Sequence, residues 1–584
     1  ENPQALPLET EQIELLIHAA KQDWKEVEPA IFGTLLERAL DPKERHKLGA
    51  HYTPRSYVER LIEPTLMTPL RDQWMAVKTA AATLHMEEER LEKEAEQKYA
   101  EGAELLESGK GSKAKAAGAA AAKLKAEAKR KHTAALETIS SFHQHLCQIK
   151  VLDPACGSAN FLYVALARIK ELEAEVLELF AEFGGNTMVE MASFKVRPDQ
   201  FWGLEINERA CAIAQLVLWI GYFQWHHKTT GSADTNDRPL LPKQQTIINK
   251  DAVLEYDERV PRQDPETGEF LTIWNGFTTK THPVTGKEVP DESARKPLFD
   301  YINSRRTEWP EADYIVGNPP FLGASRMRDG LGDGYTEALR LAWKKHKPNS
   351  WDFVMFWWHQ AAELVRDGKA EQFGFITTNS IHQTFNRRCI EPFLSNDKKP
   401  VSITFAIPDH PWVDSADGAD VRIAMTVAEK GKSHGLLNVV TEEVECEDGE
   451  HSTQFSLKIG MIATNLKTGA NVNSTQPLKA CENLCNRGFC LFGSGFIVDP
   501  EVAKILNAKS IKTGQNIIHD YRNGRDIAST PRGVKVIDAY GLSVKELQTQ
   551  HPAVFQHLVN TVKPERDNNK RESRRKYWWL FGEP

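Results

Sequence analysis

The sequence predicts an α/β protein built on an open, doubly wound sheet. Between residues 149 and 430, short stretches rich in β-branched residues alternate with longer stretches of helical spacing. Hydrophobic residues make up 41% and charged residues 26% of the chain, as in ordinary globular proteins, which excludes a mainly disordered chain. The 584 residues are too many for one compact core and indicate about three or four domains.

Two helical regions are expected before the sheet. Residues 1–76 carry apolar side chains at helical spacing and predict a helical layer. Residues 77–145 contain an acidic block followed by a lysine- and alanine-rich block. This composition favours an antiparallel helical hairpin that turns near residues 108–112. We interpret the hairpin as a solvated insertion, and a basic arm that touches nucleic acid is the alternative.

The sheet itself is expected within residues 146–430. The seven predicted strands are residues 150–152, 200–205, 246–249, 314–317, 372–377, 403–407 and 423–429. Residues 431–584 contain weaker strand patterns and one short helical pattern at 500–506, so they predict a second, α+β domain.

A turn of small residues follows the first predicted strand and leads into a helix. The turn consists of Asp153, Pro154, Ala155, Cys156, Gly157, Ser158, Ala159, Asn160 and Phe161. Such a turn lets a ligand approach the backbone at the carboxyl end of the sheet. Its single glycine argues against a pyrophosphate or triphosphate ligand. Asp153 instead suits a ligand with a cationic group, although the motif alone is also compatible with a purely structural turn.

Carboxylates also stand at the ends of the next two predicted strands. Glu205, followed by Ile206, can accept hydrogen bonds from two ribose hydroxyls. Asp251 follows the third strand and can accept one from the exocyclic amine of an adenine. Together with Asp153, these residues predict a site for a cationic adenosine ligand.

The fourth predicted strand ends in the tetrad Asn318, Pro319, Pro320 and Phe321. Two prolines fix the local chain, so the Asn318 amide oxygen and the Pro319 carbonyl become a rigid pair of acceptors. Such a pair can hold an amino group on a planar ring and turn its lone pair toward an electrophile. Phe321 offers a ring on which a flipped base can stack, a contact worth about 1–3 kcal/mol. A plain Asn-Pro turn is the alternative.

Charge and cysteine content set further limits. The net charge of −8 argues against a uniformly basic surface, yet it permits a local basic face. Eight cysteines are too few for a disulfide framework, and Cys481, Cys485 and Cys490 lack zinc-ribbon spacing, so no metal is expected. The apolar runs are too short for a bilayer and no signal pattern precedes them, which predicts a cytoplasmic protein without membrane contact.

These motifs resemble those of S-adenosylmethionine-dependent amino methyltransferases, and the Asn318–Phe321 tetrad is similar to that of DNA adenine-N6 enzymes. Residues 49–54 resemble the family's N-terminal cofactor element. The resemblance implies that Tyr52, Thr53 and Pro54 close over the methionine end of the cofactor. The order of the motifs resembles the gamma class, in which a target recognition domain follows the catalytic one.

Further segments, at residues 375–380, 493–496, 521–526 and 578–584, resemble large bacterial methylases of type IIL restriction-modification and of DISARM-like phage defence. The resemblance covers most of the chain outside residues 77–145. It implies a seven-stranded Rossmann-like methyltransferase sheet in residues 146–430 and the start of a target recognition domain in residues 431–584. The start at Glu1 and the apolar residues near the end suggest a piece of a longer protein.

Two features depart from the resembled family. Ala159 stands where the family usually has glycine, which adds a methyl group near the cofactor. Residues 1–48 show no nuclease constellation, so we expect a methylase whose nuclease is missing or was removed.

The implied function is site-specific methyl transfer from S-adenosylmethionine, leaving S-adenosylhomocysteine, to N6 of an adenine flipped out of double-stranded DNA. The tetrad would be catalytic. The methylation would protect host DNA in a restriction or phage-defence system, and a helicase or nuclease subunit would be a further partner. The implied cofactor residues are Tyr52, Thr53, Pro54, Asp153, Ala155, Gly157, Ser158, Asn160, Phe161, Glu205, Ile206 and Asp251. The expected DNA contacts are Arg326, Arg328, Arg387 and Arg388. The alternatives are methylation of RNA or of a protein glutamine, and a catalytically silent DNA-binding subunit.

Overall fold

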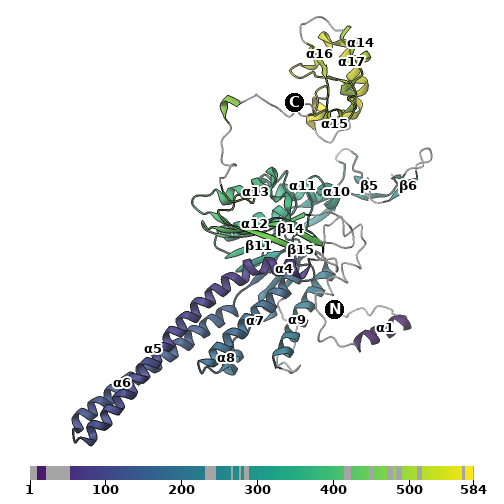
Figure 1. The fold of residues 1–584 in the computed structure, drawn as a ribbon. Coiled ribbons are helices and arrows are strands. Elements are labelled where there is room, and N and C mark those ends of the chain that lie inside the picture. Colours follow the sequence, from purple (N-terminus) through teal and green to yellow (C-terminus); the bar gives the residue numbers. More distant parts are fainter. Residues whose placement is uncertain are drawn as a thin grey trace. The chain divides into compact units, whose positions relative to one another are not determined.

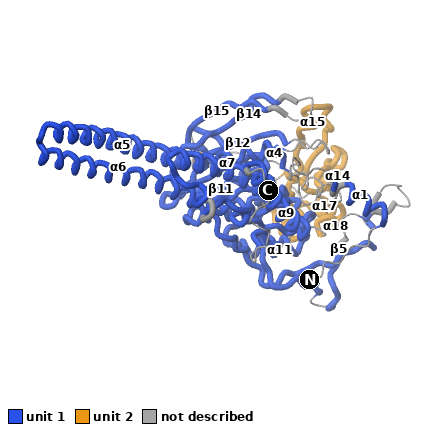
Figure 2. Tube along the Cα trace, turned by 90° about the horizontal axis from the view of Figure 1, so that it is seen from below, with its two compact units in different colours: residues 1–471 blue, residues 472–584 orange. Residues whose placement is uncertain are grey.

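The computed structural model is shown as a ribbon in Figure 1. It describes residues 9–21, 53–230, 245–264, 267–274, 278–281, 288–291, 293–412, 422–445, 451–469, 478–481, 490–508, 516–567 and 572–582. The chain divides into two compact units, residues 1–471 and 472–584, which Figure 2 colours separately.

A nine-stranded sheet forms the centre of the first unit. In spatial order its strands are β15 (His451–Gly460), β14 (Gly435–Glu445), β12 (Val401–Pro411), β13 (Arg422–Lys430), β11 (Gln372–Thr378), β10 (Tyr314–Gly317), β1 (Val151–Asp153), β2 (Phe201–Glu205) and β3 (Ile247–Asn249). The five strands from β11 to β3 are parallel, whereas β13 runs antiparallel to both of its neighbours. All seven predicted strands lie in this sheet, which confirms the α/β class.

The sheet is two strands larger than predicted. β14 pairs in parallel with β12, and β15 pairs antiparallel with β14, so the sheet continues beyond the expected domain boundary at residue 430. Leu457 and Ile459 of β15 are exposed. A strand at the edge of a sheet is only partly buried, so its sequence lacks the continuous apolar run that marks the central strands.

Helices cover both faces of the sheet. α4 (Arg55–Ile62), a π-helical turn (Glu63–Met67), α7 (Asn160–Glu182) and α9 (Glu208–Thr230) share one hydrophobic core with one face. α11 (Asp333–Ala342), α12 (Val354–Arg366) and α13 (Thr384–Leu394) share a second core with the other face. The central strand β1 contributes side chains to both cores, because Val151 lies in the first core and its neighbour Leu152 in the second. The sheet is therefore doubly wound.

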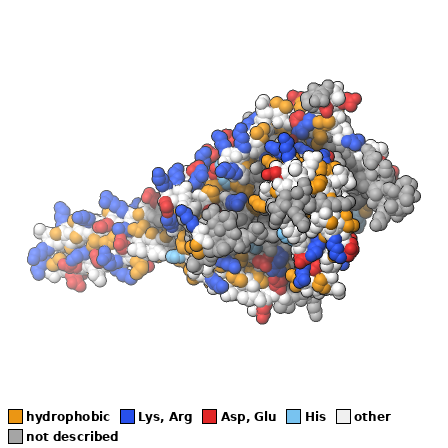
Figure 3. All heavy atoms as spheres, turned by 90° about the horizontal axis from the view of Figure 1, so that it is seen from above, with side chains coloured by type: hydrophobic (Ala, Val, Ile, Leu, Met, Phe, Trp, Pro, Cys, Tyr) orange, Lys and Arg blue, Asp and Glu red, His pale blue; other side chains and the backbone are white. Residues whose placement is uncertain are grey.

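The predicted helical hairpin is confirmed as α5 (Thr68–Glu107) and α6 (Gly111–Leu146), which project from the sheet (Figure 1). Small residues such as Ala81, Ala121 and Ala135 are fully buried in its seam, which lets the two helices approach closely. Ion pairs such as Lys131–Glu87, at 2.6 Å, cross the seam. Side chains of both charge signs cover the hairpin in Figure 3.

The remaining elements of the first unit are short. They are α1 (Thr10–Ala20), α8 (Thr187–Ser193), β4 (Glu258–Pro261), β5 (Thr272–Trp274), β6 (Thr279–Thr281), β7 (Glu288–Pro290), β8 (Arg295–Pro297), β9 (Phe299–Ile302), α10 (Met327–Leu331) and 3-10 turns at Pro198–Gln200, Lys344–His346 and Asn379–His382. The small strands pair as β4–β9, β5–β8 and β6–β7.

The second unit has its own core around a three-stranded sheet. Its strands are β16 (Ile497–Val498), β18 (Lys535–Ile537) and β17 (Ile518–Asp520) in spatial order. Its helices are α14 (Pro500–Ala508), α15 (Gly524–Ala528), α16 (Val544–Gln550), α17 (Pro552–Thr561), α18 (Lys563–Asp567) and α19 (Glu572–Lys576), with 3-10 turns at Lys479–Cys481 and Ser494–Phe496. Within the described ranges, every helix is too short or too polar to cross a bilayer.

Candidate active site at the strand ends

The carboxyl ends of the parallel strands form the candidate site. From β1 the chain proceeds to β2 and β3 on one side, and it returns to β10 on the other side of β1. Ligands of open α/β sheets bind at such a reversal of strand order. Asp153, Glu205 and Asn318 stand at the ends of β1, β2 and β10, so the topology brings them to one edge.

The turn after β1 is anchored on β2. The Cys156 N–H donates to the Leu204 carbonyl at 3.1 Å, and the Gly157 N–H donates to Oε2 of Glu205 at 3.0 Å. From α12, Trp357 Nε1 donates to the Pro154 carbonyl at 2.9 Å. These bonds hold the turn over the sheet edge.

Ala159 has a left-handed backbone, with φ of 68°, and its side chain is fully buried. It directly precedes α7. Glycine adopts this conformation without strain, whereas alanine pays a cost, so the structure explains why a glycine would suit the position. Gly157 in the same turn also has a positive φ, of 52°.

Asp153 is the most deeply buried acid of the site, at 1% exposure. Its Oδ1 accepts a hydrogen bond from the Ala155 N–H at 3.0 Å. An added Cβ on Gly317 would lie 2.5 Å from the same oxygen, so Asp153 packs against the residue that precedes Asn318. Burial raises the pKa of Asp153 to about 8, although the Ala155 hydrogen bond lowers it, and nearby Glu205 adds to the rise.

Glu205 and Asp251 are also held by the backbone. Oε1 of Glu205 accepts from the Asn207 N–H at 2.8 Å, and burial raises the pKa of Glu205. Oδ1 of Asp251 accepts from two backbone N–H groups, while Oδ2 accepts from the Tyr335 hydroxyl at 2.6 Å. Burial raises the pKa of Asp251 as well. In the part of the chain that the structure describes, neither these two acids nor Asp153 has an ion-pair partner.

Thr53 joins the cofactor turn to the tetrad. Its hydroxyl accepts a hydrogen bond from Nδ2 of Asn318 at 3.0 Å, and its carbonyl accepts one from Nδ2 of Asn160 at 2.6 Å. The Oδ1 atoms of both asparagines are buried and have no hydrogen-bond partner among the described residues. Thr53 therefore sets the orientation of both amides and leaves their acceptors open.

Phe321 belongs to an aromatic group that the sequence did not reveal. Its ring packs edge to face against the ring of Trp412, with the ring centroids 6.0 Å apart. The ring centroids of Trp412 and Tyr57 are 5.4 Å apart. The Tyr57 hydroxyl donates to the Pro411 carbonyl at 2.9 Å. Trp412 and Tyr57 thus support the ring from elements far away in the chain.

The loop after the tetrad is fixed by Asp352. Its Oδ1 accepts from the Ala324 N–H at 2.9 Å, and its Oδ2 accepts from the Ser380 hydroxyl at 2.6 Å and from Nδ2 of Asn386 at 2.8 Å. The loops after β10 and β11 are therefore tied together. Ser380 is part of the segment 375–380 that the family resemblance had marked.

The other predicted cofactor residues differ in their surroundings. Ala155, Gly157 and Ser158 are partly buried in the turn, and Pro54 directly precedes α4. Phe161 is buried in the core, with 3% exposure, whereas Ile206 is 70% exposed. Tyr52 lies outside the described residues.

The four predicted DNA-contacting arginines are not equally available. Arg328 pairs with Asp333 at 2.5 Å and with Glu337 at 3.2 Å, so its charge is already balanced. Arg387 donates to the Thr384 hydroxyl at 3.3 Å, and Arg388 lies over the Phe385 ring at 5.3 Å. Arg326 and Arg388 are exposed.

Comparison with known proteins fits this geometry. Residues 125–437, more than half of the chain, match the family described as MmeI, DNA-methyltransferase domain. DNA methyltransferase A of Bacillus subtilis (strain 168) is 21% identical over 397 residues, which are 68% of this chain and 33% of that protein. The chain thus spans about a third of the length of this curated relative.

The fold is also similar to a solved structure, that of the Type IIL restriction-modification enzyme MmeI in complex with DNA. The TM-score is 0.51 at 19% sequence identity, and the match covers 99% of this chain and 63% of the other. At this identity the likeness shows the shared fold. On the family match, the chain belongs to the MmeI-type DNA methyltransferases of restriction-modification.

Proposed function

We propose that the protein methylates the N6 amino group of adenine in double-stranded DNA, with S-adenosylmethionine as the methyl donor. One observation carries the proposal. Buried carboxylates without a described cationic partner occur at the same sheet edge as the Asn318 Oδ1, which has no hydrogen-bond partner among the described residues. Family membership supports methyl transfer to DNA, and the tetrad adds the preference for an amino nitrogen.

The residues at the sheet edge fit this cofactor. Asp153 is buried without a positive partner among the described residues, so a ligand ammonium group would relieve the cost of its charge. Glu205 retains lone pairs for two ribose hydroxyls beside its backbone bonds. Asp251 can accept from an adenine amine beside Tyr335, because each carboxylate oxygen accepts more than one hydrogen bond. S-adenosylmethionine, when bound, supplies an electrophilic methyl group on a positively charged sulfur.

Asn318 and Pro319 orient the nucleophile. The Asn318 Oδ1 and the Pro319 carbonyl can accept the two N–H groups of an amino nitrogen, which turns its lone pair out of the base plane. Positioning of this kind can account for much of the rate increase. The amide oxygen is too weak a base to keep a proton, so the proton that the methylated nitrogen releases passes to solvent.

The base must leave the duplex to reach this edge, and Phe321 can stack on it. We propose that Arg326, Arg387 and Arg388 contact DNA phosphates. Arg328 is left out because Asp333 and Glu337 already neutralise its charge. Such an enzyme would protect host DNA in the bacterial cytoplasm, alone or with nuclease or helicase subunits of a restriction or phage-defence system.

Replacing Asn318 with alanine tests the proposal. We expect Asn318→Ala in the full-length protein to abolish N6-methyladenine in DNA, measured by mass spectrometry of digested nucleosides. Cofactor affinity, measured by calorimetry, should persist, because the hydrogen bonds that hold Asp153, Glu205 and Asp251 do not involve Asn318. Retained methylation would refute the role of Asn318, and N4-methylcytosine as the product would refute the choice of base.

A catalytically silent DNA-binding subunit is the second candidate, favoured by the left-handed, buried Ala159 beside the cofactor turn. Calorimetry of the unmodified protein separates the two readings. The enzyme requires measurable affinity for S-adenosylmethionine, whereas the silent subunit requires none.

A further inference from the structure

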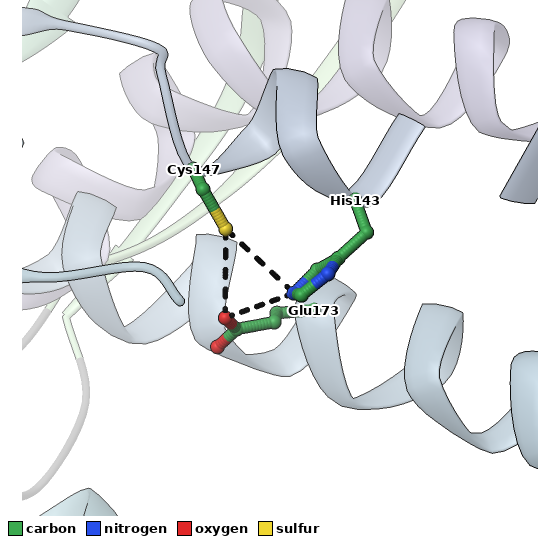
Figure 4. A group of neighbouring side chains, drawn as sticks. All are labelled: His143, Cys147 and Glu173. Atoms are coloured by element: carbon green, nitrogen blue, oxygen red, sulfur yellow. Dashed lines mark hydrogen bonds and ion pairs between the residues drawn. The ribbon is translucent and has the colours of Figure 1, made fainter. Parts of the chain in front are cut away.

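A cluster of potential metal ligands lies away from the strand edge, where the hairpin joins the sheet. His143 and Cys147 are one turn apart at the C-terminal end of α6, and both face Glu173 of α7 (Figure 4). His143 is 1% and Glu173 0% exposed, while Cys147 is half-buried. A histidine, a cysteine and a glutamate thus converge from two helices.

The distances within the cluster match those around a tetrahedral ion. Nε2 of His143 lies 3.4 Å from Oε1 of Glu173 and 3.6 Å from Sγ of Cys147, and that sulfur lies 3.9 Å from the same oxygen. With usual bond lengths, tetrahedral Zn²⁺ places N and O about 3.4 Å apart and sulfur about 3.6 Å from either. One ion could therefore contact all three atoms after small shifts.

The groups behind the ligands hold them in place. Nδ1 of His143 lies 3.1 Å from Oε1 of Glu190, which also accepts from the Ser140 hydroxyl at 2.8 Å. Lys170 donates to Oε2 of Glu173 at 2.7 Å, so it engages the oxygen that faces away from the cluster. Metal-binding histidines commonly bond a carboxylate through their second nitrogen in this way.

We propose that His143 Nε2, Cys147 Sγ and Glu173 Oε1 bind a zinc ion. A thiolate and an imidazole select zinc over magnesium or calcium. Oε1 of Glu173 also accepts from the Val196 N–H at 2.7 Å, which leaves it a lone pair for the ion. Among the described residues the cluster offers three ligands, and a water molecule completes the tetrahedron.

The charges balance with the ion in place. Zinc, the thiolate, Glu173, Glu190 and Lys170 sum to zero when His143 is neutral. The same sum holds without an ion when His143 is protonated and Cys147 is a thiol. The net charge of the cluster is zero in both states, so the metal content of the protein is the measurement that distinguishes them.

The ion would act as a structural clamp. Cys147 is the C-cap of α6, and three residues separate it from β1, whose last residue is Asp153. Joining α6 to α7 at this point fixes the entry of the chain into the strand that carries Asp153. Because the three ligands converge only in the folded chain, binding of the ion would add to folding stability.

Metal analysis of the purified full-length protein tests the site. We expect about one zinc ion per chain by inductively coupled plasma mass spectrometry. After removal of zinc and loading with Co²⁺, absorption bands of tetrahedral cobalt and a sulfur-to-cobalt charge-transfer band should appear. This test uses the unmodified protein. Absence of stoichiometric metal, or a cobalt spectrum without the charge-transfer band, would overturn the proposal.

Two cysteine variants locate the site. Cys147→Ser should abolish the charge-transfer band, whereas Cys490→Ser, which replaces a free cysteine of the second unit, should retain it. Circular dichroism confirms that each variant is folded. A band that survives Cys147→Ser, or disappears in Cys490→Ser, would place the metal elsewhere and refute the assignment.

Discussion

Two buried aspartates, one in each unit, have opposite surroundings. Asp526 of the second unit, 3% exposed, receives Nε and Nη2 of Arg532 at 2.8 and 2.7 Å and a backbone N–H from Asn523 at 3.0 Å. Asp153 of the first unit, 1% exposed, has a single backbone donor and no cation among the described residues. The Arg532 hydrogen bonds lower the pKa of Asp526, whereas burial raises that of Asp153 to about 8.

The difference separates a structural acid from an acid that we propose binds a ligand. Asp526 has its full set of partners within the chain, and it also completes the capping box of α15 by accepting from the backbone of the N-cap residue Asn523. When Asp153 is ionised, no described residue balances its charge, and such a charge is tolerated where a ligand balances it. Burial alone is therefore uninformative, and the partners decide which buried acid is a candidate for function.

Exchanging each aspartate for asparagine should separate the two roles, and this is the largest effect we expect. Asp153→Asn should weaken S-adenosylmethionine binding by about 100-fold or more, because it removes a buried charge opposite the ammonium group. The thermal midpoint at pH 7 should stay the same or rise, because the variant lacks a carboxyl group that ionises freely on unfolding but stays protonated in the folded chain. Calorimetry and thermal unfolding measure both quantities.

Asp526→Asn serves as the matched control. It should lower the thermal midpoint at pH 7 and leave cofactor affinity unchanged, because Arg532 loses its ionic partner. Because the folded-state pKa of Asp526 is lowered, this stabilisation disappears as the pH falls below the ordinary aspartate range. Equal effects of the two exchanges on affinity would break the comparison.

The pH dependence of cofactor affinity should show the raised pKa of Asp153. The ion pair requires an ionised carboxylate and a protonated ammonium, so affinity should fall about tenfold per pH unit below about 8 and fall again at higher pH as the ammonium loses its proton. Without ligand, the folded chain holds a proton that the unfolded chain releases above the ordinary value of 3.8, so this group's contribution to stability decreases as pH rises from about 4 to 8. Asp153→Asn should flatten the acidic side of the affinity profile, and a slope that remains there in that variant would assign the titration to another group.

The smallest expected effect concerns Thr53. Thr53→Val removes the hydroxyl that accepts from Nδ2 of Asn318, so the amide loses its fixed orientation. At saturating cofactor we expect kcat to fall about tenfold, equivalent to about 1.4 kcal/mol. Thr53→Ser keeps the hydroxyl and should restore kcat. A loss in both variants would mean that the threonine methyl group, rather than the hydrogen bond, matters.

Much of the candidate site could be predicted because it follows local patterns. Asp153, Glu205 and Asn318 each come directly after a short apolar strand, and parallel strands end at a common edge. The predicted strands of the sheet were found for the same reason, since buried central strands are continuous apolar runs. β14 and β15 were missed as part of the sheet because the edge strand β15 and its neighbour β14 are partly exposed and lack that signal.

Contacts between distant segments could not be predicted. The spacing of His143 and Cys147 is visible in the chain as one helical turn, yet Glu173 joins them only because α7 packs on α6. Tyr335 reaches Asp251 from a helix 84 residues away. No local pattern encodes such pairings.

The sequence by itself determined which residues end the strands and which chemical groups they carry, because the alternation of apolar and polar residues defines each strand and its end. Only the tertiary structure decided which of these groups remain unpaired. Thr53, 265 residues away in the chain, accepts a hydrogen bond from the Asn318 amide and orients it. Arg532 forms an ion pair with Asp526, whereas no described residue forms one with Asp153. Pairing depends on distance in space, which a folded chain sets independently of distance along the sequence.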